Sequence, residues 1–346
     1  MRAMVLRGKA LAIEDVEVPK PGPGQVLAKV LACGICGSDL HAARYMEEMM
    51  ASARAGGRRT WYDDDPGAGI IMGHEFVAEV VQVGLGAEAF TPGTRVTSVP
   101  VLVSPESPTG FQSIGYSPVI PGAYGEYVVM TASLLLRVPE NVSSTVAATT
   151  EPSAVGLHAV REASVSAGDK VLVMGAGPIG LMTLLWLKKE GVERVTVSDP
   201  SPERRELAAR LGADQVINPA NEDVAAAFAA AREGSQPNVV FECVGIQGTL
   251  GQAMALVQVH GKVMVVGVCM LEDTIRPMVG INKQLTLKFV LGYSGPEYAE
   301  ALAALADGSV NTEALVTRTV TLDELPAAFI ALADPKDCKI VVLPNG

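Results

Sequence analysis

Nine residues near the N-terminus, CGICGSDLH at 33–41, bring together two thiols, a hydroxyl, a carboxylate and an imidazole. A structural zinc site built on this Cys-x-x-Cys pair would need two further nitrogen or sulfur ligands at short spacing. The other cysteines, at 243, 269 and 338, are isolated, so that interpretation lacks ligands. A catalytic zinc needs only three protein ligands and one open position. Cys36, together with His74 from the segment GHE at 73–75 and one carboxylate, would meet this need.

A second segment has the residue types of a dinucleotide-binding turn. GAGPIG at 175–180 follows the strand-like run KVLVM and opens an apolar, helix-like run. In this pattern Gly175 permits a tight turn, Gly177 lets the backbone approach a pyrophosphate, and Gly180 lets helix and strand pack closely. The helix N-terminus adds unpaired N–H groups and the positive end of a dipole. The pattern predicts a nucleotide site, against the alternative of a glycine-rich turn without a ligand.

The acidic residue after the next strand-like run indicates which dinucleotide is bound. Asp199 follows Gly180 by 19 positions. A carboxylate at this point can accept hydrogen bonds from both ribose hydroxyls and would repel a 2′-phosphate. No arginine follows immediately, although Arg204 and Arg205 are near. We therefore expect NAD rather than NADP. Further cofactor contacts are expected from Pro178, Ile179, Arg204, Val244 and Val268.

Taken in chain order, these motifs resemble the zinc-dependent alcohol and polyol dehydrogenases, of the sorbitol dehydrogenase type, in the medium-chain dehydrogenase/reductase superfamily. The resemblance covers most of the chain and includes two more segments, EPSAVGLH at 151–158 and ECVG at 242–245. It implies that Cys36 and His74 bind one catalytic zinc. Glu75 and Glu151 are both candidates for the third ligand, and the sequence does not decide between them.

The resemblance also implies a mechanism for hydride transfer between a secondary alcohol or polyol, or the corresponding ketone, and NAD. Zinc would act as a Lewis acid that lowers the pKa of the substrate hydroxyl. Ser38 would accept the hydroxyl proton, and His41 would pass it to solvent through the cofactor ribose, since the ordinary imidazole pKa lies near working pH. Asp39 would support the metal site by orienting a ligand.

The sequence departs from the family pattern in two places. Residues 97–122, where relatives usually carry a lobe with four cysteines, contain no cysteine, so we expect no structural zinc. The 38 residues from Cys36 to His74 are more than the family usually shows, which predicts an extra loop at 42–69. Two alternative functions are a zinc-free quinone or enoyl reductase of the same superfamily and a catalytically silent NAD-binding sensor. The intact Cys36/His74 pair argues against both.

The hydrophobic pattern changes near residue 155. Earlier residues predict short strands separated by Pro and Gly. Later apolar runs, at 170–174, 194–198, 215–217, 239–242, 262–266 and 285–291, alternate with helix-like segments such as 179–190 and 202–211. This alternation is typical of a parallel sheet with right-handed crossovers. A final strand at 339–343 is expected to pack back onto the first domain. The expected α/β fold is a GroES-like β-barrel catalytic domain (1–154 and 296–346), implied by the resemblance, and a Rossmann doubly wound NAD-binding domain (155–295).

Composition limits the remaining function classes. Of 346 residues, 49% are hydrophobic, which excludes a disordered chain. A net charge of −11 without a basic block argues against nucleic acid as a partner. The longest apolar stretch, 178–187, is about half a bilayer span, and no secretory signal is recognised. Five cysteines, an odd number, predict a cytoplasmic protein. The resemblance implies a homodimer or homotetramer, joined at sheet edges near 285–291, and a small-molecule substrate.

Overall fold

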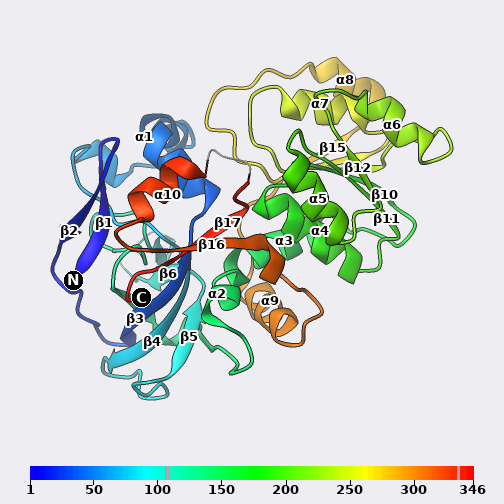
Figure 1. Ribbon diagram of the computed structural model, residues 1–346. Helices are drawn as coiled ribbons and strands as arrows, with labels where there is room; N and C mark the ends of the chain where they lie inside the picture. Colours follow the sequence, from blue (N-terminus) through cyan, green and yellow to red (C-terminus); the bar gives the residue numbers. More distant parts are fainter. Residues whose placement is uncertain (106, 108, 333–335) are drawn as a thin grey trace. The chain divides into compact units, whose positions relative to one another are not determined.

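The computed structural model describes residues 1–105, 107, 109–332 and 336–346, and they form two compact units (Figure 1). Unit 1 contains Met1–Glu151 and Val316–Gly346, and unit 2 contains Pro152–Leu315. Unit 2 is therefore inserted into the chain of unit 1. It extends beyond the predicted boundary at residue 295, because helix α9 (Gly295–Ala306) is tied to helix α3 (Thr150–Ala163) by the ion pairs His158–Glu297 and Arg161–Glu300.

Unit 1 is built on a mixed sheet with the strand order β16-β17-β3-β4-β5-β9, in which β8 also pairs with β3. The strands are β3 (Gln25–Gly34), β4 (Glu75–Val83), β5 (Arg95–Ser98), β8 (Tyr127–Thr131), β9 (Leu135–Arg137), β16 (Val316–Thr321) and β17 (Lys339–Leu343). Alternate residues of β3 are apolar or small and are buried, as a half-buried strand requires. The last strand, β17, runs antiparallel to β3, so the end of the chain returns to the first unit as expected.

The described part of unit 1 also contains two hairpins and, apart from the 19-residue α1, short helices. The hairpins are β1 (Arg2–Arg7) with β2 (Ala10–Asp15), and β6 (Val101–Val103) with β7 (Phe111–Ser113). The helices are α1 (Gly37–Ala55), η1 (Trp61–Asp63), η2 (Ala132–Leu134), α2 (Ser144–Ala147) and α10 (Leu325–Ala331). The second hairpin lies within the cysteine-free region 97–122.

The expected loop at 42–69 is largely helical, so that part of the expectation was wrong. Helix α1 continues to Ala55, with a kink at Tyr45, where the backbone has φ −130° and ψ 38°. The segment is rich in Ala, Met and Glu, which are strong helix formers. We call residues 42–69 the inserted segment.

Unit 2 contains a parallel sheet with the order β12-β11-β10-β13-β14-β15, the strand order of dinucleotide-binding folds. Its strands are β10 (Lys170–Met174), β11 (Arg194–Ser198), β12 (Gln215–Ile217), β13 (Val239–Glu242), β14 (Lys262–Val265) and β15 (Thr286–Phe289). Besides α3 and α9, its helices are α4 (Pro178–Lys189), α5 (Pro202–Arg210), α6 (Val224–Ala230), α7 (Thr249–Leu256), α8 (Pro277–Lys283) and η3 (Glu313–Leu315). The predicted α/β class is confirmed. Within the described ranges, no helix is long and apolar enough to cross a membrane.

Candidate active site

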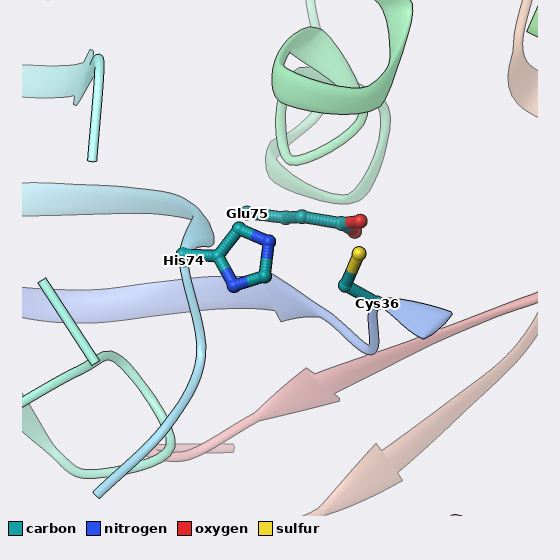
Figure 2. A group of neighbouring side chains, drawn as sticks. All are labelled: Cys36, His74 and Glu75. Carbon is teal, nitrogen blue, oxygen red and sulfur yellow. The ribbon is translucent and has the colours of Figure 1, made fainter. Parts of the chain in front are cut away.

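The pairing of β3 with β4 brings together three of the predicted metal ligands. Gly34, at the end of β3, is the register partner of Glu75, at the start of β4. Cys36 follows β3 by two residues and His74 directly precedes β4, so all three side chains lie at the same end of the pair. One possible ligand atom from each of Cys36, His74 and Glu75 lies within 4.8 Å of the others. Figure 2 shows the Cys36 sulfur facing the Glu75 carboxylate.

This group fits a catalytic zinc ion by the chemistry of its donors. Cys36 is not in a disulfide, and His74 and Glu75 are buried. Thiolate, imidazole and carboxylate are the ligand types that zinc takes from proteins, and three of them leave a fourth position for water or substrate.

A buried lysine that the sequence analysis missed holds the Glu75 carboxylate. The Lys339 ammonium donates to Oε1 and Oε2 of Glu75 at 2.8 and 2.7 Å, and to the Ile35 carbonyl at 2.9 Å. Lys339 is 1% exposed. Burial alone would lower the pKa of Lys339, but Glu75 raises it above its ordinary value, so the lysine stays charged. One sequence feature could have pointed to Lys339: it is the charged first residue of an otherwise apolar strand.

Glu151, the other carboxylate considered for the metal, lies in the first turn of α3. Its side chain is buried, but it does not belong to the group of atoms within 4.8 Å that Cys36, His74 and Glu75 form. The structure thus brings Glu75 to the other two ligands and leaves Glu151 outside that group.

Asp39 is fully buried and lies at the centre of a hydrogen-bond network. The hydroxyls of Tyr116 and Tyr124 donate to its Oδ1 and Oδ2 at 2.7 and 2.6 Å. Nδ1 of His74 is 3.3 Å from Oδ1, which is an electrostatic contact without hydrogen-bond geometry. Burial alone would raise the pKa of Asp39, but His74 and the two hydroxyls lower it, so Asp39 is a carboxylate. The Asp39 carboxylate therefore lies in electrostatic contact with the His74 ring.

The same neighbours shift the pKa of His74. Burial alone would lower the pKa of His74, but the charges of Asp39 and Cys36 raise it well above its ordinary value. These two acidic neighbours thus favour a positive charge on the His74 ring itself.

Ser38 connects Cys36 to the tyrosines. Its Oγ lies 3.2 Å from the Cys36 sulfur and 2.8 Å from the Tyr116 hydroxyl. Burial and the charge of Asp39 raise the pKa of Tyr116 well above its ordinary value, so its hydroxyl keeps its proton. The sequence analysis missed Tyr116 and Tyr124, because they lie far along the chain and no motif marks them.

His41 follows Ser38 by three residues on α1, a spacing that places the two on one side of the helix. No hydrogen bond between them is found in the part of the chain that the structure describes, and the buried Nδ1 of His41 has no partner there. Burial and the charge of Arg44 lower the pKa of His41, which favours the neutral ring.

The predicted nucleotide turn has the geometry that its glycines require. Gly175 adopts φ +92°, and a Cβ on Gly180 would collide with the carbonyl oxygen of Gly175. Helix α4 begins at Pro178, with Ile179 in its first turn and Gly177 as the N-cap. Asp199 braces this turn, since its Oδ2 accepts from the Ala176 N–H and its Oδ1 from the Ser201 N–H, both at 2.8 Å.

The other expected cofactor residues lie at the same, carboxyl edge of the parallel sheet. Val244 follows β13 and Val268 follows β14, with exposed fractions of 38% and 45%. A Cβ on Gly175 would lie 3.0 Å from Val244, and a Cβ on Gly177 would lie 3.8 Å from an Arg204 nitrogen. Ligands of open α/β sheets bind at this edge.

Comparison with known proteins gives a family match in each of the two units. Residues 22–140 match the family model of the alcohol dehydrogenase GroES-like domain, and residues 178–307 match that of the zinc-binding dehydrogenases. The chain is 35% identical, over 350 residues, to (R,R)-butanediol dehydrogenase of Bacillus subtilis (strain 168), covering 97% of each chain. The chain therefore belongs to the zinc-type medium-chain alcohol and polyol dehydrogenases.

Two further similarities extend over nearly the whole chain. Sorbitol dehydrogenase of Bos taurus is 33% identical over 342 residues, which cover 94% of this chain and 91% of that protein. The crystal structure of 2R,3R-butanediol dehydrogenase from Bacillus subtilis superposes with a TM-score of 0.84 at 33% identity, covering 99% of each chain. The protein is thus a zinc-dependent oxidoreductase of alcohols or polyols that uses a nicotinamide cofactor. The zinc-free reductase and the silent sensor are not favoured.

Proposed function

We propose that the protein interconverts a secondary alcohol, in particular a diol or polyol, and its ketone with NAD, using a single zinc ion. The observation that carries this proposal is the convergence of Cys36, His74 and Glu75 beside the Ser38 hydroxyl. The names of the relatives, butanediol and sorbitol dehydrogenases, support a substrate with more than one hydroxyl group. The absence of cysteine from residues 97–122 supports one zinc ion rather than two.

Cys36, His74 and Glu75 would hold the zinc ion. A carboxylate offers about four lone pairs, so Glu75 can keep its two bonds to Lys339 and still donate to a metal. Glu151 is the alternative ligand, or a partner acting through one water. Asp39 orients His74 in this arrangement, as an outer carboxylate does for a metal-bound imidazole.

When bound, the metal supplies Lewis acidity that lowers the pKa of a substrate hydroxyl, and the nicotinamide ring supplies a hydride acceptor. The chain's own task is to move the proton. Ser38 accepts it, because its hydroxyl is the one next to the metal ligands. His41 passes it on, since its neutral ring has a nitrogen available for a proton.

NAD is the proposed cofactor, since Asp199 places a carboxylate at the end of β11, where NADP would bring a 2′-phosphate. Pro178, Ile179, Arg204, Val244 and Val268 are the proposed further contacts. Tighter binding of NADP than of NAD would contradict this assignment.

The test of the metal site compares three variants in zinc content, NAD binding and NAD reduction with a panel of secondary alcohols and polyols. Cys36→Ser should lose zinc and turnover but bind NAD nearly as well as the wild type, because the nucleotide turn belongs to unit 2. Glu75→Gln should lose more zinc than Glu151→Gln. Full activity in a zinc-free preparation would overturn the proposal, and the reverse order of zinc loss would make Glu151 the ligand.

We further propose a homodimer or homotetramer in the cytoplasm, where cysteines that are not in disulfides remain reduced. Strand β15 is the edge of its sheet, and exposed apolar side chains lie at its end and just beyond it, with Phe289 71% and Leu291 89% exposed. An exposed, apolar edge strand is suited to pairing with a second copy. Phe289→Lys should lower the mass measured by light scattering, and an unchanged mass would exclude this edge.

A further inference from the structure

The Tyr116 hydroxyl is the group that touches both Ser38 and Asp39. We propose that Tyr116 is a positioning residue for Ser38: it accepts the Ser38 hydrogen bond and so leaves the Ser38 lone pairs free to accept a hydrogen bond from the substrate hydroxyl. This inference rests on the role of Ser38 given under Proposed function and adds the residue that makes Ser38 an acceptor.

The direction of each hydrogen bond follows from counting protons. Both oxygens of Asp39 accept from a tyrosine hydroxyl, Oδ1 from Tyr116 and Oδ2 from Tyr124, so the single hydroxyl proton of Tyr116 is donated to Oδ1. The Tyr116 oxygen can then only accept a hydrogen bond from Ser38, at 2.8 Å. With its one proton directed at Tyr116, Ser38 keeps lone pairs for the proton of a substrate hydroxyl.

Cys36 is the competing acceptor for the same serine proton. Its sulfur lies 3.2 Å from Ser38 Oγ, while the Tyr116 oxygen lies at 2.8 Å. The sulfur of a neutral thiol is also the weaker acceptor. Tyr116 therefore sets the orientation of the Ser38 hydroxyl.

Tyr116 is itself fixed on both sides. Its ring lies against the His74 ring, with 5.5 Å between centroids. Its carbonyl oxygen accepts from the Trp61 indole N–H at 2.8 Å, so η1 of the inserted segment anchors the backbone at Tyr116. A tyrosine held in this way can impose an orientation on a mobile hydroxyl.

Tyr124 provides a matched control. Its hydroxyl donates to the other oxygen of Asp39 at 2.6 Å and, more weakly, to the Gly34 carbonyl at 3.2 Å. No bond to Ser38 is found among the described residues. If Tyr116 only braced Asp39, removing either hydroxyl would act on turnover in the same way.

The experiment measures kcat and zinc content for Tyr116→Phe and Tyr124→Phe, each in the wild type and in Ser38→Ala. We expect Tyr116→Phe to keep zinc and to lower kcat about tenfold, the effect of one hydrogen bond in the transition state. In Ser38→Ala it should lower kcat no further. Any loss from Tyr124→Phe should be the same with and without Ser38. An unchanged kcat in Tyr116→Phe, or an equal loss in the Ser38→Ala background, would overturn the proposal.

A second measurement does not depend on turnover. In protein freed of zinc with a chelator, Tyr116→Phe and Ser38→Ala together should destabilise the chain by less than the sum of the single changes, measured by denaturant unfolding. Simple additivity there would also overturn the proposal. If Ser38→Ala leaves kcat unchanged, the proposed function of Ser38 fails; if it slows turnover while Tyr116→Phe does not, only the present inference fails.

Discussion

The two units bury charged groups in different ways. In unit 1, buried side chains bond to one another: Lys339 with Glu75, and Asp39 with two tyrosines. In unit 2, buried carboxylates accept mainly from backbone N–H groups nearby. Asp199 takes those of Ala176 and Ser201, and Glu242 takes those of Val244 and Gly245. The candidate metal site is thus assembled from distant segments, and the predicted nucleotide turn is assembled from loops at one sheet edge.

This difference has a functional reason. A metal ion needs several charged or polarisable side chains at one point, and their charges must be balanced by other side chains. A dinucleotide phosphate needs free backbone N–H groups, which a correctly shaped turn already presents. Unit 1 should therefore be sensitive to the loss of single side-chain partners, and unit 2 to changes in its backbone acceptors.

The largest expected effect comes from the buried pair in unit 1. Lys339→Met leaves the Glu75 carboxylate buried without its partner, which should lower the free energy of unfolding by about 3–5 kcal/mol. Denaturant unfolding measures the total loss in the free energy of unfolding. Hydrogen exchange by segment should show that this loss falls on β3, β4 and β17. Adding Glu75→Gln should recover part of the loss, because no unpaired charge remains. Equal stability of Lys339→Met and the wild type would mean that Glu75 does not depend on this lysine.

A smaller effect is expected from the brace of the nucleotide turn. Asp199→Ala removes the acceptor of two backbone N–H groups, at Ala176 and Ser201, and should cost about 1–3 kcal/mol. NAD affinity should fall as well, which calorimetry can measure. Asp199→Asn is the control, since one amide oxygen remains. If faster hydrogen exchange after Asp199→Ala appeared in unit 1 instead of around β10 and β11, Asp199 would not be the brace of the nucleotide turn.

The contrast between local and distant bonds also explains what the sequence could predict. Strands β10 to β13 coincide with the predicted runs, because each is a short apolar segment bounded by turn residues. Cys36 and His74 were recognised from their motifs, and the register of β3 with β4 brings them together. These strands and motifs are each defined by neighbouring residues, so they can be recognised from the sequence alone.

The missing parts of the site depend on contacts between distant residues. Lys339 reaches Glu75 across 264 positions, and Tyr116 reaches Asp39 across 77. No motif in one sequence encodes such pairs, so the sequence alone does not show that Glu75, rather than Glu151, lies in one group with Cys36 and His74. The helix at the start of the inserted segment is a different case, since its Ala, Met and Glu content was visible but the extra length between Cys36 and His74 suggested a loop.

The smallest expected effect concerns Glu297, a buried carboxylate of unit 2 that accepts from a backbone N–H group and also from side chains. The side chain accepts from the Ser294 N–H and hydroxyl at 2.7 Å, and from His158 of α3 at 3.1 Å. Burial alone would raise the pKa of Glu297, but Ser294 and His158 lower it. A carboxylate with a lowered pKa in the folded state stabilises the fold above its ordinary value of 4.5, and this stabilisation disappears as the pH falls through the lowered pKa.

Glu297→Gln removes the charge and keeps a residue that can complete the helix cap. At pH 7 we expect it to cost about 1 kcal/mol, and the difference from the wild type should shrink as the pH falls below 4.5 in a series of denaturant titrations. The control is Glu300→Gln on the same helix, whose bond to Arg161 is exposed to solvent and should contribute less. If both variants lost equal stability at every pH, burial of the carboxylate would not be what distinguishes Glu297.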